Sequence, residues 1–471
     1  MSAPETTYAA EALPARRFAT LTLVRGALIA IAITLAGGFL AVLYSVPWLA
    51  PAFQSVGLDL RQLRPIHTTF AAAWIFMGGV AVVYRFLQEA GPATEGDRWR
   101  LRIQVLAWAA AGLGILVTLL VGVGSGREYV GFHPIFSALI LIGWICYGWN
   151  FFRVVGGDFW SRPVHVTMWG VGVLFFGYTF IEQHAYLLSG VFADPVHDLR
   201  VQWKATGALV GSFNLLCYGT VVYVGARMST DGSYGRSRIA YALLGVGLLN
   251  SFTNFAHHTY HLPQRPLVVW ISFLVSMTEI VILARVVWDV WSMVAARDTR
   301  EFSSTRALFT ASKWWTMAIL FSSLLISIPP LNAVIHGTYV VTGHAMGATI
   351  GIDTMILLGA IVWILEDVLN ARGDSDARAL LHGGRARRAI IGLNVSVALF
   401  VGWLHVSGLV TGLTRMTFAA NETYVSPAWL ATSSGVVFAL AGIVVIEFFI
   451  RLLRTLIPVA FRPFHPEGPH P

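Results

Sequence analysis

Twelve long apolar segments recur along the chain, and their length constrains the fold more than any other feature. Each is close to or above the ~20 residues that a helix needs to cross a bilayer. Charged residues make up 12% of the sequence, about half of the ~25% that is usual in soluble domains. The sequence therefore predicts an all-α integral membrane protein, a bundle of about twelve transmembrane helices. The segments lie at about 20–48, 65–88, 103–123, 133–156, 163–188, 201–226, 237–258, 266–292, 308–330, 338–367, 388–413 and 427–455.

Basic residues are distributed unequally between the two sets of loops. With the N-terminus inside, the outer loops hold few of the 32 Lys and Arg residues: Arg61, Arg64, Arg127, Arg200, Arg265 and Arg415. The positive-inside rule therefore predicts cytoplasmic termini in a bacterial inner membrane. We expect one polytopic membrane domain over 1–471, with cytoplasmic tails at 1–18 and 456–471. The first apolar run is too long for a cleavable signal peptide.

The composition excludes several kinds of site. The net charge of +8 follows from the topology and does not indicate nucleic-acid binding. The two cysteines, Cys146 and Cys217, each lie inside an apolar run, and the chain has no CxxCH motif. A covalent c-type haem, a paired-cysteine copper site and a cysteine-ligated cluster are therefore excluded. The 14 histidines are the main reserve of metal ligands.

Five candidate ligands are predicted to share one depth near the outer face. In the predicted topology odd segments run outward and even segments inward. His67 then lies near the start of the second segment, His257 and His258 near the end of the seventh, and His344 and Met346 near the start of the tenth. His344 and Met346 are two residues apart, so they point to opposite helix faces, about 200° apart. A histidine within the membrane is a functional candidate; the alternative is that each one packs at the interface or bonds a backbone carbonyl.

The ligand types indicate the chemistry. Neutral imidazole and thioether groups are axial ligands of haem iron. Two adjacent histidines at a helix end suit a transition metal. Because the helices bring no cluster of acidic side chains to this depth, the pattern favours haem plus a non-haem metal over calcium or magnesium.

Several local motifs together resemble those of one protein family. They are His67-Thr68-Thr69 followed by Trp74, Gly126-Arg127-Glu128-Tyr129, Ala256-His257-His258-Thr259-Tyr260, and His336-Gly337-Thr338 followed by Gly343-His344. With the twelve-segment pattern, they make the sequence resemble the catalytic subunit of the haem-copper oxidase superfamily. It is most similar to the large (cytochrome b) subunit of bacterial nitric oxide reductase.

The resemblance implies a role for each candidate residue. His67 would bind a low-spin b-type haem, and His344 would bind the high-spin haem of the active site. His257 and His258 would bind a non-haem iron or copper ion, with Glu279 as a buried catalytic carboxylate near it. A calcium site at the outer face is also implied, where Glu128 is the candidate residue.

The sequence departs from the family pattern at three places. Met346 stands where the family has its second helix-ten histidine; a His67/Met346 pair still ligates haem and raises its potential, while the alternative is a five-coordinate or absent haem. Thr206 and Val210 stand where we expect a third metal histidine and a glutamate, and Lys204 lies beside them. Glu279 could instead complete a set of two histidines and one carboxylate, which suits iron.

The first functional hypothesis is a haem-containing terminal reductase subunit. It would reduce two NO to N2O and water, or O2 to water, with electrons from a periplasmic cytochrome c-type partner. The second hypothesis is a divergent haem protein of the membrane that has lost the binuclear metal centre and transfers electrons or binds a gas. A third is a transporter that uses polar residues within the membrane.

Overall fold

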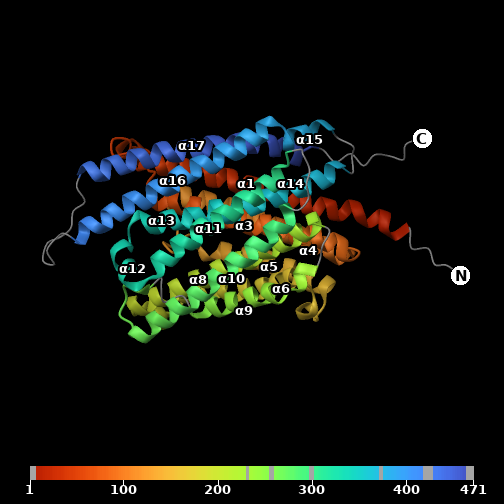
Figure 1. Ribbon diagram of the computed structural model, residues 1–471, viewed down its shortest axis with the longest axis horizontal. Helices are drawn as coiled ribbons and strands as arrows, with labels where there is room; N and C mark the ends of the chain where they lie inside the picture. Colours follow the sequence, from red (N-terminus) through yellow and green to blue (C-terminus); the bar gives the residue numbers. More distant parts are fainter. Residues whose placement is uncertain are drawn as a thin grey trace.

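The computed structural model describes residues 7–229, 233–253, 259–295, 302–370, 375–416 and 428–462. All regular secondary structure in these ranges is helical, and eleven of the helices are long and apolar enough to cross a membrane. Most helices run side by side along the long axis of the molecule (Figure 1). The prediction of an all-α membrane bundle is therefore confirmed. The predicted seventh segment, 237–258, corresponds to a shorter apolar helix that is described only as far as Thr253.

The helices follow the predicted segments in order. The long ones are α1 (Thr7–Tyr44), α3 (Leu60–Ala90), α4 (Glu95–Leu120), α5 (Pro134–Val155), α6 (Val164–Glu182), α8 (Pro195–Ser229), α9 (Arg238–Thr253), α10 (Pro266–Ala295), α11 (Ser304–Ser327), α14 (Met355–Asn370), α16 (Gly384–Met416) and α17 (Ala428–Ala460). The short ones are α2 (Ala50–Ser55), α7 (Ser189–Phe192), α12 (Pro329–Ile335), α13 (Tyr339–Met346) and α15 (Ser375–His382). We call the two ends of the bundle the α12 end and the α15 end, after the short helices that lie there (Figure 1).

Two helices begin earlier than the apolar pattern predicts, because polar residues cap them. Asp59 caps α3: its carboxylate accepts a hydrogen bond from the Arg61 amide at 2.7 Å, and its own amide donates to Gln62 Oε1 at 2.8 Å. Thr94 caps α4 in the same reciprocal way with Asp97. Such capping boxes add a polar first turn that hydropathy alone assigns to a loop.

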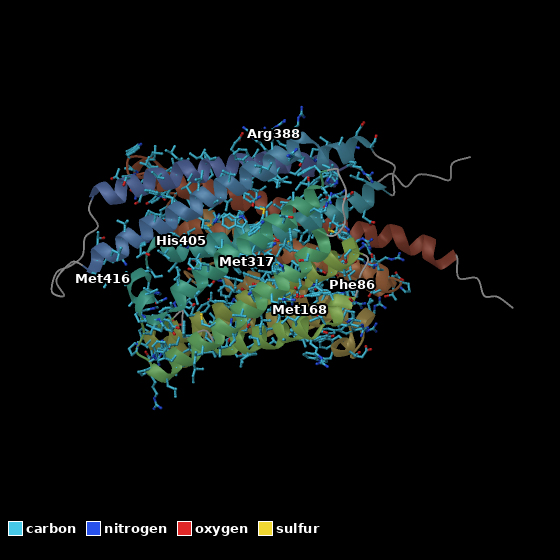
Figure 2. The ribbon with its side chains drawn as sticks, in the orientation of Figure 1. Phe86, Met168, Met317, Arg388, His405 and Met416 are labelled. Carbon is cyan, nitrogen blue, oxygen red and sulfur yellow. The ribbon has the colours of Figure 1, made fainter. Side chains whose placement is uncertain are left out.

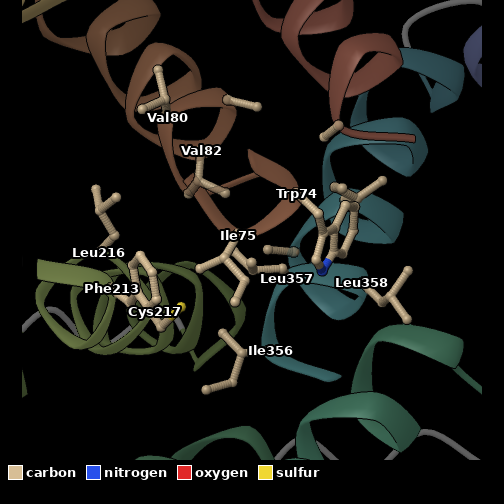
Figure 3. Close-up of a cluster of buried hydrophobic side chains, with 14 of the residues drawn as sticks. Trp74, Ile75, Val80, Val82, Phe213, Leu216, Cys217, Ile356, Leu357 and Leu358 are labelled. Carbon is tan, nitrogen blue, oxygen red and sulfur yellow. The ribbon is translucent and has the colours of Figure 1, made fainter. Parts of the chain in front are cut away.

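A buried apolar cluster packs α14 against both α3 and α8 (Figure 3). Gly78 and Gly79 of α3 have no side chain, so Leu357 of α14 and Leu216 of α8 lie 3.4 and 3.1 Å from where a Cβ would be. Trp74 is fully buried beside them. This packing fixes the tenth membrane-spanning segment in the middle of the bundle.

The tenth segment is not one regular helix. It consists of α13, a wide π-helical stretch η5 (Gly347–Thr354), and α14. A Cβ on Gly347 or Gly351 would overlap Ile319 or Trp315 of α11, so these glycines allow the two helices to approach closely. Short π-helical stretches are often found at functional sites, and this one directly follows His344 and Met346.

Candidate functional site

His67 on α3 is held by the backbone of α1. Its Nδ1 lies 2.9 Å from the carbonyl oxygen of Thr34. A carbonyl only accepts hydrogen bonds, so Nδ1 carries the proton and Nε2 keeps its lone pair. The ring lies against Gly38, where a Cβ would be 2.8 Å from Nδ1. A fixed tautomer with a free Nε2 is the arrangement that an axial haem ligand needs.

Thr34 and Gly38 were not among the candidate residues of the sequence. The Thr34 contact uses a backbone carbonyl, which every residue type supplies, so no residue type marks it. Only the adjacent glycines Gly37 and Gly38 could have indicated this contact from the sequence, since both lie against His67.

One hydrogen bond sets the register between α3 and the tenth segment. Trp74 Nε1 donates to Thr354 Oγ1 at 3.1 Å. Gly78, four residues after Trp74, faces Leu357, which comes three residues after Thr354. Both contacts advance in the same direction, so α3 and the tenth segment run parallel. His67 precedes Trp74 by seven residues and Met346 precedes Thr354 by eight. At about 1.5 Å per residue, the two side chains start within roughly 2 Å of the same depth.

The side chain of His344 starts less than one helical turn nearer the α12 end than that of Met346, and it lies on a different flank of α13. It precedes Thr354 by ten residues, about 3 Å beyond Met346 at helical rise. Gly343 marks the face of α13 that packs on α16, because a Cβ there would lie 2.7 Å from His405 Nδ1. Relative to that face His344 is rotated by about 100° one way and Met346 by about 60° the other.

The candidate metal ligands are only partly placed. His257 and His258 lie outside the described residues. Among the residues that the structure does describe, no group of three or more His, Cys, Asp or Glu side chains is arranged to hold a metal ion. Glu279 of α10 points into the bundle, with Oε1 3.6 Å from where a Cβ of Gly247 on α9 would be.

Glu279 lines a small cavity of about 20 Å³, a volume that holds about one water molecule. Asn214 and Tyr218 of α8 and Ser251 of α9 line the same cavity. A carboxyl group at this depth in a membrane protein is costly unless it has a partner or a role. The surrounding hydroxyl and amide groups are suited to hold a water that exchanges a proton with it.

Thr206, at the predicted third-ligand position of α8, and its neighbour Lys204 both bond side chains of α6. Lys204 Nζ lies 2.6 and 2.7 Å from the two carboxylate oxygens of Glu182 and 2.8 Å from the Tyr178 hydroxyl. Thr206 Oγ1 accepts a hydrogen bond from Gln183 Nε2 at 2.9 Å in a buried position. The ammonium group is therefore turned away from the bundle centre, and the threonine hydroxyl is engaged by α6.

Two histidines join the loop after α9 to the segment before α13. The rings of His261 and His336 stack with centroids 4.2 Å apart and planes at 27°. Burial lowers the pKa of both, and His261 lowers that of His336 further. Arg415 donates to the His336 carbonyl oxygen at 3.4 Å. The stack thus links the stretch that follows His258 to the helix that carries His344.

The Arg127–Tyr129 loop is fixed by ion pairs at the α12 end. Arg127 Nη1 lies 2.8 and 2.9 Å from the carboxylate oxygens of Asp198, and Glu128 accepts from Arg64 at 2.7 Å. Tyr129 has a φ of 62°, the one positive φ of a described residue other than glycine. Burial raises the pKa of Tyr129 to about 12. The Glu128 carboxylate, the candidate for calcium, is thus already bound by a guanidinium group.

Comparisons with known proteins agree with this architecture. A sequence model of the family described as cytochrome c and quinol oxidase polypeptide I matches residues 22–444. The fold is similar to a structure described as a heme-copper terminal oxidase dimer, solved by cryo-electron microscopy. The TM-score is 0.74 at 16% identity, over 96% of this chain and 85% of that chain. No curated protein matches the sequence.

Proposed function

This chain belongs to the cytochrome c and quinol oxidase polypeptide I family, and within it we propose that the chain is the haem-containing catalytic subunit of a terminal reductase related to nitric oxide reductase. Membership makes it a membrane protein of the terminal oxidase type. The α12 end of the bundle would face the periplasm, and the termini the cytoplasm, in a bacterial inner membrane. The substrate is a small gas, NO or O2.

The observation that carries the proposal is the fixed tautomer of His67 at the depth of Met346. Nε2 of His67 is unprotonated because Nδ1 donates to Thr34, and a parallel helix brings a thioether to the same level. These two side chains would hold a low-spin b-type haem, and His344 would hold the second haem. Bound haem supplies one-electron redox chemistry, and a methionine ligand raises its potential relative to a second histidine.

The chain's other residues would supply metal ligation and protons. His257 and His258 would hold a non-haem iron or copper, with Glu279 as the carboxylate that completes the set or exchanges protons with the substrate. Glu279 is suited to the second task because hydroxyl and amide groups share its small cavity. Electrons would come from a periplasmic cytochrome c-type partner, since the sequence holds no c-type haem site of its own.

A second candidate function rests on the α8 side chains. Lys204 and Thr206 are both engaged by α6, so α8 offers no imidazole or carboxylate at the predicted ligand position. A membrane haem protein that transfers electrons or binds a gas, without the non-haem metal, would have this arrangement.

Metal and haem analysis of the purified protein separates the two functions. The terminal reductase predicts two b-type haems and one further iron or copper per chain. The alternative predicts haem without the further metal. Absence of any haem Soret band would contradict both.

A further inference from the structure

The π-helical stretch of the tenth segment carries a carboxyl group to which the proposed function assigns no role. Asp353 is the one ionisable residue of η5, and it is buried, with 6% of its surface exposed. It lies near the middle of the membrane-spanning segment Tyr339–Leu369. A carboxyl group at that depth is costly unless it has a partner or a role. Asp353 is therefore a candidate functional residue.

The hydrogen-bond partner of Asp353 is a thiol group. Cys217 of α8, part of the buried cluster in Figure 3, shares a hydrogen bond with the Asp353 carboxyl group. A thiol is a weak donor and brings no positive charge, which an ionised carboxylate in an apolar site needs. The ammonium group of Lys313, on the adjacent helix α11, instead stacks on Trp288 and Trp291, with Nζ 3.5 and 3.3 Å from the ring centres. We therefore expect Asp353 to hold a proton in the resting protein.

Tyr218 links this pair to the Glu279 cavity. It follows Cys217 on α8 and lines that cavity. It also lines a second cavity of about 20 Å³, together with Ile352, the residue before Asp353. Both carboxyl groups interact electrostatically with the Tyr218 side chain. Each cavity holds about one water molecule, and a phenol hydroxyl both donates and accepts hydrogen bonds. Tyr218 is therefore suited to pass a proton from one carboxyl group to the other.

Asp353, Tyr218 and Glu279 lie deep in the membrane-spanning part of the bundle. The second cavity is also lined by Thr316 of α11, and Met317, the next residue, lies about midway between the α12 end and the α15 end (Figure 2). Glu279 is near the middle of α10. At this depth neither carboxyl group reaches the solvent at either surface. A proton that moves between them must therefore pass through groups inside the bundle.

We propose that Asp353 stores a proton for the reduction and passes it to Glu279 through Tyr218. This role rests on the proposed function and adds a residue to it. Reduction of two NO molecules to N2O and water takes up two electrons and two protons, and the two buried carboxyl groups hold one proton each. Reduction of O2 to water takes up four of each, so the same pair would be loaded twice. Asp353 does not touch the substrate; it replaces the proton that Glu279 gives away.

The transfer forms and breaks only bonds to hydrogen. Glu279 gives its proton to the substrate oxygen that leaves as water. Tyr218 then donates its hydroxyl proton to the Glu279 carboxylate, through the water of their cavity, and takes the proton of Asp353 in exchange. The thiol of Cys217 donates a hydrogen bond to the Asp353 carboxylate that remains. A proton from solvent restores Asp353 after the turnover, and the electrons come from the donor of the proposed function.

The pair itself is tested by infrared spectroscopy of the full-length protein. Thiol S–H bands stand apart from other protein bands, and the chain has two cysteines, so Cys146→Ala and Cys217→Ala assign both bands. Asp353→Asn should shift the Cys217 band and remove the carbonyl band of one protonated carboxyl group. The Cys146 band is the internal control and should stay in place. An unmoved Cys217 band, or no lost carboxyl band, overturns the proposal.

The donor role is tested by mixing the reduced full-length protein with NO and, separately, with O2. Asp353→Asn and Tyr218→Phe should slow haem reoxidation at least tenfold and enlarge its isotope effect in D2O. Asp353→Glu keeps a carboxyl group and should recover most of the rate. Asp376→Asn, at an exposed position on α15, is the matched control and should react as wild type does.

A wild-type rate in Asp353→Asn overturns the donor role. Failure of the proposed function would appear differently. The wild-type protein would then lack a Soret band or consume neither gas, while Asp353→Asn still shifts the Cys217 band, and the donor role would fall with the function.

Discussion

Two helix interfaces use their polar side chains in opposite ways. The first lies between α3 and the tenth segment, and the second between α8 and α6. In the first, His67 is oriented by a backbone carbonyl so that its second nitrogen keeps a lone pair. In the second, Lys204 and Thr206 place their polar atoms on partners from α6. His67 thus keeps one ring nitrogen with its lone pair, whereas Lys204 and Thr206 have their polar groups bound by α6.

Under the proposed function, the haem half and the metal half of the site would therefore be held by separate sets of contacts. Thr206 stands where the resemblance implies a third metal histidine, and a buried hydroxyl of this kind normally has a hydrogen-bond partner. Gln183 supplies that partner. Under the proposed function the haem half would depend on α1, α3 and α13, which do not share this contact.

The largest expected effect is that of His67→Ala. It removes the imidazole that would bind the low-spin haem, so the low-spin optical and EPR signals should disappear and the haem content should fall by one per chain. His197→Ala, at an exposed position on α8, is the control and should leave both unchanged. If the low-spin signal persists in His67→Ala, then His67 is not a ligand of the low-spin haem.

Met346→His should lower the potential of the low-spin haem. A histidine ligand stabilises ferric haem relative to a methionine ligand, and a decrease of at least about 59 mV corresponds to a tenfold change for one electron. A spectroelectrochemical titration measures it, with Met317→His, on α11, as a matched substitution expected to leave the potential in place. An unchanged potential in Met346→His means that Met346 is not a ligand.

Thr206→Ala sharpens the metal side of the comparison. It removes the partner of the buried Gln183 amide, a loss of about 1–3 kcal/mol in the free energy of unfolding. Metal content should stay constant, because Thr206 serves α6 rather than a metal. Thermal unfolding monitored together with metal analysis measures both, and a loss of metal would assign Thr206 to the metal site.

The smallest effect is a pH dependence of the loop contact between His261 and His336. Burial lowers both pKa values in the folded protein below the ordinary 6.5. The unfolded loop therefore binds protons first, so the contact is fully stable above pH 6.5 and weakens as the pH falls below it. Amide hydrogen exchange at Thr338 should rise over that range in wild type and rise less in a His261→Phe variant, in which only His336 still titrates.

The apolar pattern predicted the bundle because segment length and bilayer thickness are tied by helix geometry. It placed the start of α3 late, since the cap formed by Asp59 and Gln62 is polar. It also treated the tenth segment as a single helix. The π-helical stretch after Met346 depends on how Gly347 and Gly351 pack on α11, which no local sequence pattern reports.

The candidate ligands could be chosen from the sequence, but their partners could not. Trp74 and Thr354 are 280 residues apart, and His67 is oriented by a backbone carbonyl. The sequence places Lys204 beside the predicted ligand position, but the direction of its side chain is decided by Glu182. Such pairings are set by the packing of distant helices, so a one-dimensional pattern does not contain them.

The near-infrared magnetic circular dichroism spectrum of the ferric protein tests the central claim most directly, because it distinguishes methionine from histidine as an axial ligand of low-spin haem. We expect the signature of one histidine and one methionine, lost in Met346→Leu and in His67→Ala. A bis-histidine signature in wild type, or a histidine–methionine signature that survives Met346→Leu, would contradict the pairing of α3 with α13 around one haem.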